Sequence, residues 1–271
     1  MRRRDFLATG AAVMAGAGLR TLARGEENAT VAGSSRQWIE IRRYHFDSLE
    51  KQKAYGQFLS GAAIAAFGRA GAKPVGVFRE MAGDNPKLKL SQDSTDLWVI
   101  LGHESAQACA EFESRLAGDA EYQGAGKPIL SAGKEDAAFS RYDTELLIAF
   151  GGFPRVMPRA LSESRVLELR NYESPNQERA ANKVAMFNRG EIPIFDRCGL
   201  PGIFWGSAIA GGALPHLTYM VWHETIEHAP KGWKAFGADP EWIRLKNDPQ
   251  YKDNVSKVTN IFLRPLPGSQ I

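Results

Sequence analysis

Two trios of polar side chains, each a glutamate, an arginine and a tyrosine spaced two residues apart, are the best candidates for chemistry in this sequence. They are Glu40, Arg42 and Tyr44, and Glu168, Arg170 and Tyr172. A spacing of two places each trio on one face of a β-strand. Guanidinium and phenol groups donate hydrogen bonds, so such a face can hold a small ligand, with Trp205, Trp222 and His223 as further candidate contacts. The alternative is structural: the glutamates and arginines pair across strands and fix the packing of two sheets.

A second motif, the run from His223 to His228 with sequence HETIEH, is not predicted to bind a metal. Zinc proteases place two histidines four residues apart on one helix face. Here the histidines are five residues apart, which separates them by about 140° around a helix. The paired glycines Gly211 and Gly212 lack the lysine and the helix start of a phosphate-binding loop. We therefore expect neither a metal nor a cofactor.

The chain repeats itself. Leu217–Trp242 echoes Leu97–Tyr122 at a constant offset of 120, so that His223-Glu224 falls on His103-Glu104. The two cysteines, Cys109 and Cys198, occupy positions that do not correspond, so no disulfide framework repeats. A bridge between them would need their Cα atoms within ~4.4–6.8 Å. We favour two buried thiols.

Each copy is expected to fold in the order β-α-β-β-α-β, the ferredoxin-like split unit. The expected strands are 38–44, 75–78, 96–103 and 142–150, then 166–172, 202–205, 216–223 and 258–263; the main helices are 49–71, 105–117, 177–199 and 225–236, with a short one at 239–242. Helices cover one face of each sheet, so the other face needs a partner. We expect an α+β chain in which two tandem repeats pack sheet to sheet as a pseudo-twofold α/β barrel. Both polar trios should lie between the sheets, and Leu167 and Leu169 beneath the helices.

The first residues indicate export. Met1–Leu7 contains the pattern Arg-Arg-x-Phe-Leu of a twin-arginine signal, followed by an apolar run too short to span a bilayer as a helix of ~20 residues. We predict a signal peptide at 1–23 and a flexible leader at 24–37, and hence a periplasmic or other extracytoplasmic location. The whole chain has 34 Lys and Arg against 31 Asp and Glu, and without residues 1–23 it is neutral. A neutral chain gives no electrostatic reason to expect binding to nucleic acid or to an anionic membrane.

The sequence resembles the NIPSNAP family. The residues that carry the likeness are Glu-Leu-Arg-Asn-Tyr at 168–172, Phe-Asp-Arg-Cys-Gly at 195–199 and Asp-Pro-Glu-Trp at 239–242. The likeness extends over about residues 38–265 and is stronger in the second copy. The resemblance implies the dimeric α/β-barrel superfamily, and it implies no particular catalytic residues.

The sequence therefore predicts a first repeat at 38–150, a linker at 151–165, a second, NIPSNAP-like repeat at 166–265 and a tail at 266–271. The predicted function is an exported module that binds a small ligand, or a partner, through the polar and aromatic face between its sheets. A homo-oligomer is also compatible with the sequence. The alternative is an enzyme of the same superfamily, either a cofactor-free monooxygenase or a haem-related protein, by analogy of fold alone.

Overall fold

The structure is a computed structural model, and it describes residues 35–271, which form one compact unit. The predicted signal and residues 24–34 of the predicted leader lie outside the described residues. Gln37, at the end of that leader, is buried, and its side-chain amide donates to the carbonyl oxygen of Lys73 over 2.9 Å. No helix in the described part of the chain is long and apolar enough to cross a membrane.

Eight antiparallel strands close into a barrel in the order β1-β3-β2-β8-β5-β7-β6-β4. The strands are β1 (Trp38–His45), β2 (Ala72–Glu80), β3 (Asp96–His103), β4 (Arg141–Ala149), β5 (Val166–Glu173), β6 (Gly202–Ala210), β7 (His216–His223) and β8 (Lys257–Pro265). The first four strands are adjacent to one another and so are the last four, with junctions at β2–β8 and β4–β6. The α+β class and the barrel are as expected.

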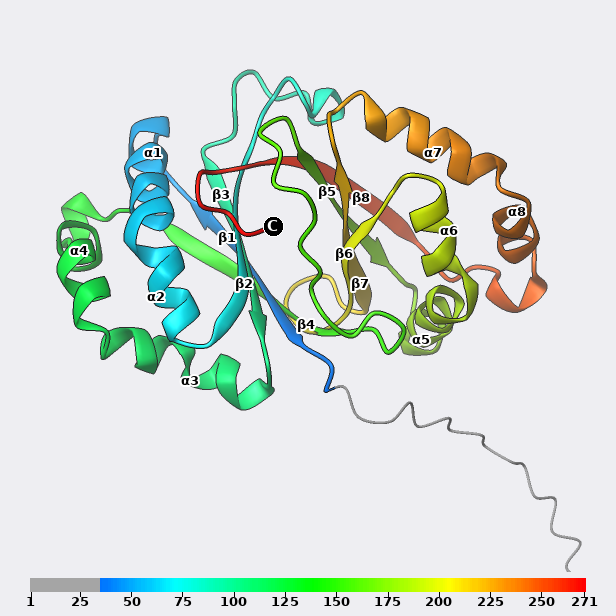
Figure 1. Cartoon of the computed structure of the whole chain (residues 1–271), viewed down its shortest axis with the longest axis horizontal. Coiled ribbons are helices and arrows are strands. Elements are labelled where there is room, and N and C mark those ends of the chain that lie inside the picture. The colour runs from blue at the N-terminus through cyan, green and yellow to red at the C-terminus, as the bar shows by residue number, and fades with distance from the viewer. Residues whose placement is uncertain (1–34) are drawn as a thin grey trace, which may run out of the picture. The chain divides into compact units, whose positions relative to one another are not determined.

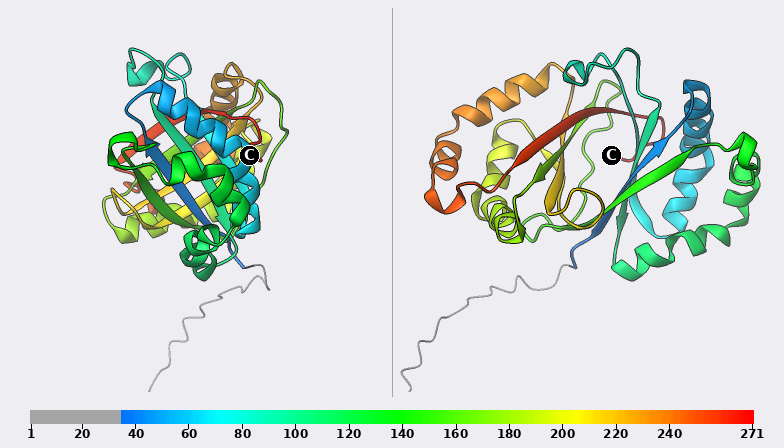
Figure 2. Two further views of the ribbon diagram at one scale, coloured as in Figure 1. Left: turned by 90° about the vertical axis from the view of Figure 1, so that its left-hand side faces the viewer. Right: turned by 180° about the vertical axis from the view of Figure 1, so that it is seen from behind.

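The helices lie outside the barrel, those of the first half on one side and those of the second half on the other (Figure 1). They are α1 (Leu49–Phe58), α2 (Ile64–Arg69), α3 (Ala106–Ala117), α4 (Ala120–Leu130), α5 (Gln177–Met186), α6 (Ile192–Arg197), α7 (His228–Ala238) and α8 (Pro240–Lys246). Short π-helical turns, Leu59–Ala63 and Phe187–Glu191, join α1 to α2 and α5 to α6, so each pair runs as one long helix as predicted. The view from behind shows the same division of helices around the barrel (Figure 2).

Local sequence explains where these helices begin. Ser105 and Asp119 are N-caps of α3 and α4, and their side chains accept hydrogen bonds from backbone amides in the first turn. Asp239 does the same for α8. Helix α4 extends for 11 residues, whereas the sequence analysis predicted no helix there. Helix α7 begins at His228, three residues after the predicted start at Thr225.

The expected orientation of the polar trios is wrong. The barrel interior is an apolar cluster that includes Ile39, Ile41, Leu167 and Leu169. The alternate residues of β1 and β5 therefore face the helices, and Tyr44 packs in the cluster beneath α1. The interior of an eight-stranded barrel is narrow, and here apolar side chains fill it. Charged groups inside it would lose water without gaining partners, whereas the helices offer partners.

Residues 266–271 pack onto the barrel. The side chain of Ile271 is buried in the interior cluster. The backbone amides of Leu266 and Gln270 donate to the carbonyl oxygens of Val77 and Val75 over 2.8 and 2.9 Å. This segment therefore lies along β2 beyond the end of β8.

Candidate functional site

Each trio is a hydrogen-bonded unit on one strand. In β1, Arg42 Nε donates to Glu40 Oε1 over 2.6 Å, and its Nη1 to the Tyr44 hydroxyl over 3.3 Å. In β5, Arg170 donates to Glu168 Oε1 over 2.6 Å and to the Tyr172 hydroxyl over 3.2 Å. The spacing of two in the sequence accounts for both arrangements.

A histidine at the end of the next strand holds the second carboxylate oxygen in each half. His103 lies opposite Trp38 in the β1–β3 ladder, so it shares a sheet face with Glu40, and its Nε2 is 3.1 Å from Glu40 Oε2. In the second half, His223 Nε2 lies 3.0 Å from Glu168 Oε2. Both carboxylates stay ionised: burial alone would raise the pKa of Glu40, but the hydrogen bond from His103 and the Arg42 charge lower it to about 2. The pKa of Glu168 is lowered in the same way.

The two halves differ in the remaining groups around the carboxylate. Glu168 accepts from Trp233 Nε1 over 2.7 Å and from Asn260 Nδ2 over 3.3 Å. At the corresponding places the first half has Glu113, which accepts from Arg42 Nη1 over 2.6 Å, and Thr144, whose hydroxyl is 3.3 Å from Glu40 Oε1. The first half also has Cys109, with its Sγ 3.9 Å from Glu40 Oε2. Burial, followed by the Glu40 charge, raises the pKa of that thiol to about 11.

Only the second trio borders a large groove. A cavity of about 770 Å³ reaches Glu168 and Arg170 between α7, β8 and the segment Gly83–Leu88 of the first half. Its lining residues are Gly83, Asp84, Asn85, Pro86, Lys87, Leu88, Glu168, Arg170, Ile226, Ala229, Pro230, Trp233, Val258, Asn260 and Phe262. The Arg170 guanidinium lies over the Trp233 ring at 4.2 Å from its centroid. Within the described chain, Arg170 Nε is buried and has no hydrogen-bond partner.

The segment Gly83–Leu88 is held in place by bonds to β8. Asn85 donates from Nδ2 to the carbonyl oxygen of Phe262 over 2.9 Å, and its Oδ1 accepts from the amide of Phe262 over 2.8 Å. Asp84 accepts two hydrogen bonds from Arg264, over 2.6 and 2.9 Å. The first half thus supplies a fixed wall of a groove whose polar floor belongs to the second half.

Of the aromatic residues predicted as ligand contacts, neither lines this groove. Trp205 is fully buried beneath the helices, with its ring stacked against Tyr219. Trp222 packs against the barrel interior and donates from Nε1 to the carbonyl oxygen of Ala160 over 3.1 Å. Trp233, which the sequence analysis did not select, takes the place expected for them. The signal was available: Ala229, Trp233 and Phe236 recur with helical spacing and mark the face of α7 turned to the sheet.

Tyr172 belongs to a deeper network. Its hydroxyl accepts from the Tyr219 hydroxyl over 2.8 Å. Burial raises the pKa of Tyr219 well above its ordinary value, so this phenol stays neutral. Beneath α5, Lys183 and Glu191 form a buried ion pair of 2.7 Å. Tyr172 links this network to Arg170, and none of the groups in the network lines the groove.

The His223–His228 motif does not converge on one point. His223 is buried against Glu168, while His228 is half-buried and its Nδ1 lies 3.6 Å from the Glu224 carboxylate. Cys109 and Cys198 are both free thiols and half-buried. Among residues 35–271, the His, Cys, Asp and Glu ligand atoms that gather closely enough for one metal ion are those of Glu40, His103 and Cys109.

A second cavity lies at one mouth of the barrel. It has a volume of about 600 Å³, and its lining includes Arg43, Glu80, Trp98, Asn171 and Thr218. His216 Nε2 donates to Glu145 at this mouth, and Thr218 donates to the same carboxylate oxygen over 2.8 Å. These groups were not predicted as site residues from the sequence, because the same residue types do not recur in the two halves.

Comparison with known proteins agrees with this architecture. Residues 167–270, in the second half, match the NIPSNAP family model. No curated protein matches the chain at a significant level. Two solved structures, candidate monooxygenases of Fusobacterium nucleatum and Lactobacillus acidophilus, are similar with a TM-score of 0.57 each. They are 7% and 10% identical to this chain, cover 86% and 85% of it, and are themselves covered to 94%.

A NIPSNAP-like domain protein of Burkholderia xenovorans is 21% identical over 38% of this chain and 85% of its own, with a TM-score of 0.33. At these identities the solved structures define the fold alone. The chain shares with the two candidate monooxygenases an α/β fold whose eight antiparallel strands here close into a barrel within a single chain.

Proposed function

We propose that this protein binds a small, planar, anionic ligand in the groove between α7, β8 and Gly83–Leu88. The observation that carries the proposal is the pairing of Arg170, whose Nε lacks a partner in the described chain, with Trp233 at the wall of a 770 Å³ groove. The Arg170 side chain is 15% exposed, and its guanidinium offers the charge that an anionic ligand needs. Ligand sites commonly combine apolar walls with a few fixed polar groups.

The charges of the groove favour an anion. Glu168 neutralises Arg170, and Arg264 neutralises Asp84. Lys87 lines the groove, is exposed and makes no ion pair within residues 35–271, so it leaves the groove with a net positive charge. Phe262, Pro86 and Trp233 supply apolar surface for a flat ligand body.

The test uses 2-naphthoate as the probe, with 2-naphthalenemethanol as its uncharged counterpart, in calorimetric titrations. Lys87→Gln should weaken naphthoate binding about two- to fivefold, as expected for a partly exposed ion pair. Lys89→Gln is the matched control, because Lys89 is exposed but does not line the groove, and it should leave binding unchanged. Equal effects of the two substitutions, or equal affinity for acid and alcohol, would contradict the proposal. Native mass spectrometry of the purified protein would show any ligand that copurifies.

Catalysis is the second candidate, and the likeness in fold to two candidate monooxygenases is what favours it. Tyr172 and Tyr219 lie behind Arg170, but a neutral Tyr219 cannot act as a base. A cofactor-free oxygenase would consume dioxygen above the uncatalysed rate when a hydroxylated naphthoate is added. The haem alternative does not fit this groove, because its lining contains no His, Cys, Met or Tyr to serve as an axial ligand.

The two halves are, we further infer, tandem ferredoxin-like repeats that arose by duplication. Glu40 and Glu168, and His103 and His223, make the same contacts in equivalent strands. Arg69 pairs with Asp119 as Arg197 pairs with Asp239. A homo-oligomer is not needed to complete the barrel. Export by the twin-arginine route, and thus an extracytoplasmic location, remains a proposal that rests on Arg3 and Arg4.

A further inference from the structure

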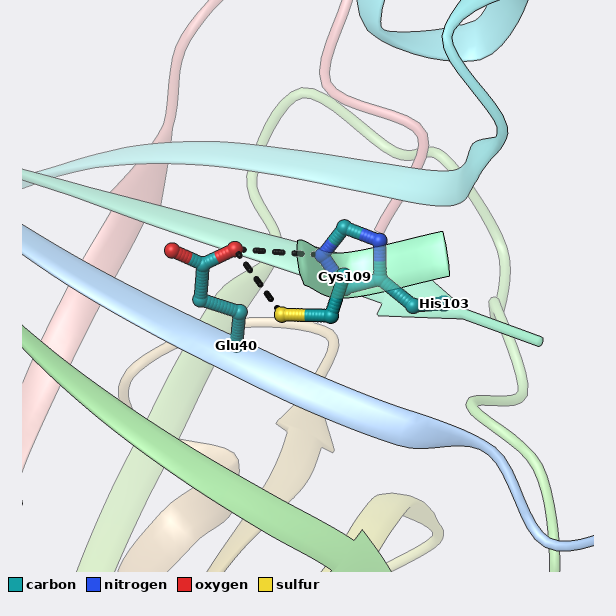
Figure 3. A group of neighbouring side chains, drawn as sticks. All are labelled: Glu40, His103 and Cys109. Carbon is teal, nitrogen blue, oxygen red and sulfur yellow. Dashed lines mark hydrogen bonds and ion pairs between the residues drawn. The ribbon is translucent and has the colours of Figure 1, made fainter. Parts of the chain in front are cut away.

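Three potential metal ligands from different elements of the first half point toward one another (Figure 3). Glu40 comes from β1, His103 from the end of β3 and Cys109 from the first turn of α3. Their ligand atoms all lie within 4.8 Å of one another. Glu40 and His103 are buried, and Cys109 is half-buried at the helix surface.

The spacing of these atoms suits a tetrahedral ion. Zinc–nitrogen and zinc–oxygen bonds of about 2.0 Å and a zinc–sulfur bond of about 2.3 Å give tetrahedral edges of roughly 3.3–3.6 Å. Glu40 Oε2 lies 3.1 Å from His103 Nε2 and 3.9 Å from Cys109 Sγ. These two edges are within about 0.5 Å of the tetrahedral values, and the third, between His103 Nε2 and Cys109 Sγ, is at most 4.8 Å, so a shift of about an ångström of the Cys109 side chain would bring all three atoms onto one ion.

The charges around the cluster also favour a cation. Arg42 is bonded to the other oxygen of Glu40, which leaves Oε2 for a metal. The same guanidinium is bonded to Glu113, so two carboxylates surround one arginine. With Cys109 as a neutral thiol, Glu40, Glu113 and Arg42 together carry one net negative charge, which attracts a cation.

We propose that Glu40, His103 and Cys109 bind one zinc-like divalent ion, with its fourth position open to water on the Cys109 side. Binding forms a sulfur–metal bond and releases the thiol proton to solvent. The mixed sulfur, nitrogen and oxygen donors match the preferences of Zn²⁺ rather than of Mg²⁺ or Ca²⁺. The site shares no residue with the ligand groove.

The second half provides an internal comparison. An alanine, Ala229, occupies the position that corresponds to Cys109, and Trp233 Nε1 donates to the Glu168 oxygen that would face a metal. The glutamate–histidine pair is otherwise the same in both halves. Only the first half should therefore bind the ion.

The test is titration of the full-length protein, purified with reductant and stripped of metal, with Co²⁺ followed by absorbance. The wild type should show one equivalent of cobalt with a sulfur-to-cobalt charge-transfer band and tetrahedral d–d bands, all displaced by Zn²⁺. Cys109→Ala, which reproduces the second half, should abolish the charge-transfer band, as should His103→Asn. Cys198→Ala and His223→Asn are matched controls and should retain it.

Absence of the band from the wild type would overturn the proposal. So would a band that persists in Cys109→Ala or disappears in Cys198→Ala. Circular dichroism separates loss of a ligand from loss of the fold, and Cys109→Ala is tolerable on packing grounds because the second half already has alanine there. Zinc should also raise the melting temperature of the wild type and leave that of Cys109→Ala unchanged, since only a ligand of the folded state stabilises it. An equal shift in both would contradict the assignment.

Discussion

Replacing Arg170 with methionine would leave the carboxylate of Glu168 buried without its cationic partner. The Glu168 side chain is 1% exposed and that of Arg170 is 15% exposed. Breaking a fully buried pair costs about 3–5 kcal/mol. Glu168 keeps hydrogen bonds from His223, Trp233 and Asn260. We therefore expect the lower end of that range, about 3 kcal/mol.

Urea and thermal unfolding measure this cost. For a chain of this size about 1 kcal/mol lowers the melting temperature by roughly 2–4 °C, so the expected drop is about 6–12 °C. The double substitution Glu168→Gln with Arg170→Met removes both charges and should recover much of the loss. Arg42→Met should cost more, because Glu40 then keeps His103 as its only nitrogen donor among residues 35–271, besides the Thr144 hydroxyl and the Cys109 thiol.

The free energy that the Glu168–Arg170 pair contributes to folding depends on pH in a definite direction. Because the pKa of Glu168 is lowered on folding, its pairing stabilises the protein above the ordinary carboxyl value of 4.5, and this contribution is lost as the pH falls through the folded value. The difference in unfolding free energy between wild type and Arg170→Met should therefore shrink as the pH is lowered below 4.5. A loss under about 0.5 kcal/mol at pH 7, or a double mutant no more stable than Arg170→Met, would refute the reasoning.

Three further changes have predictable outcomes. Burial alone would lower the pKa of His216, but the hydrogen bond to Glu145 raises it overall. The pair therefore stabilises the fold fully below pH 6.5, and its contribution is lost as the pH rises through the pKa of His216 in the folded protein. The difference in unfolding free energy between wild type and Glu145→Gln should narrow from pH 6 to pH 9. Gly202→Ala would push a methyl group into the Trp205 ring and should cost about 1–3 kcal/mol or more by overpacking, whereas Gly212→Ala, with nothing within 4 Å, should be close to neutral in urea unfolding. Replacing Arg3 and Arg4 with lysine keeps the charge and should leave precursor in the cytoplasm of the expressing cell; normal export would exclude the twin-arginine route.

The strands and their order along the chain were predictable because apolar and polar residues alternate with a clear period in each half. Alternation in β1 and β5 identified the strands, and the glycines after α2 and α6, Gly71 and Gly199, identified the helix ends, where both take positive φ angles. Helix α4 was missed because Gly124, Gly126 and Pro128 all disfavour a helix interior. Its Asp119 cap and the packing of Tyr122 against Phe58 and Phe67 offset that preference.

The face of the trios was not predictable from period alone. The alternation along β5 places its leucines on the opposite face of the sheet from Glu168 and Arg170. It does not say which face turns toward the barrel interior, because both faces of the sheet are covered by other side chains. Which face tolerates charge depends on the partners that α3 and α7 bring, and those come from distant residues such as Glu113 and Trp233. The cluster around Cys109 was not predicted, because the candidate residues were those that occur in both halves and the second half has Ala229 at the corresponding position.

A difference in loop length explains how the groove beside Glu168 and Arg170 obtains its second wall. The hairpin between β2 and β3 extends from Met81 to Thr95, whereas the one between β6 and β7 covers only Gly211–Pro215. The longer hairpin reaches the second half, where Asn85 bonds both backbone groups of Phe262 and Asp84 binds Arg264. The shorter hairpin has too few residues for an equivalent reach to the first half. The carboxylate of Glu40 in the first half instead contacts Cys109 and Arg42. Arg42 also binds a second carboxylate, that of Glu113 in α3. The two halves hold similar carboxylate centres, and the unequal hairpins leave one beside a groove and the other beside a thiol.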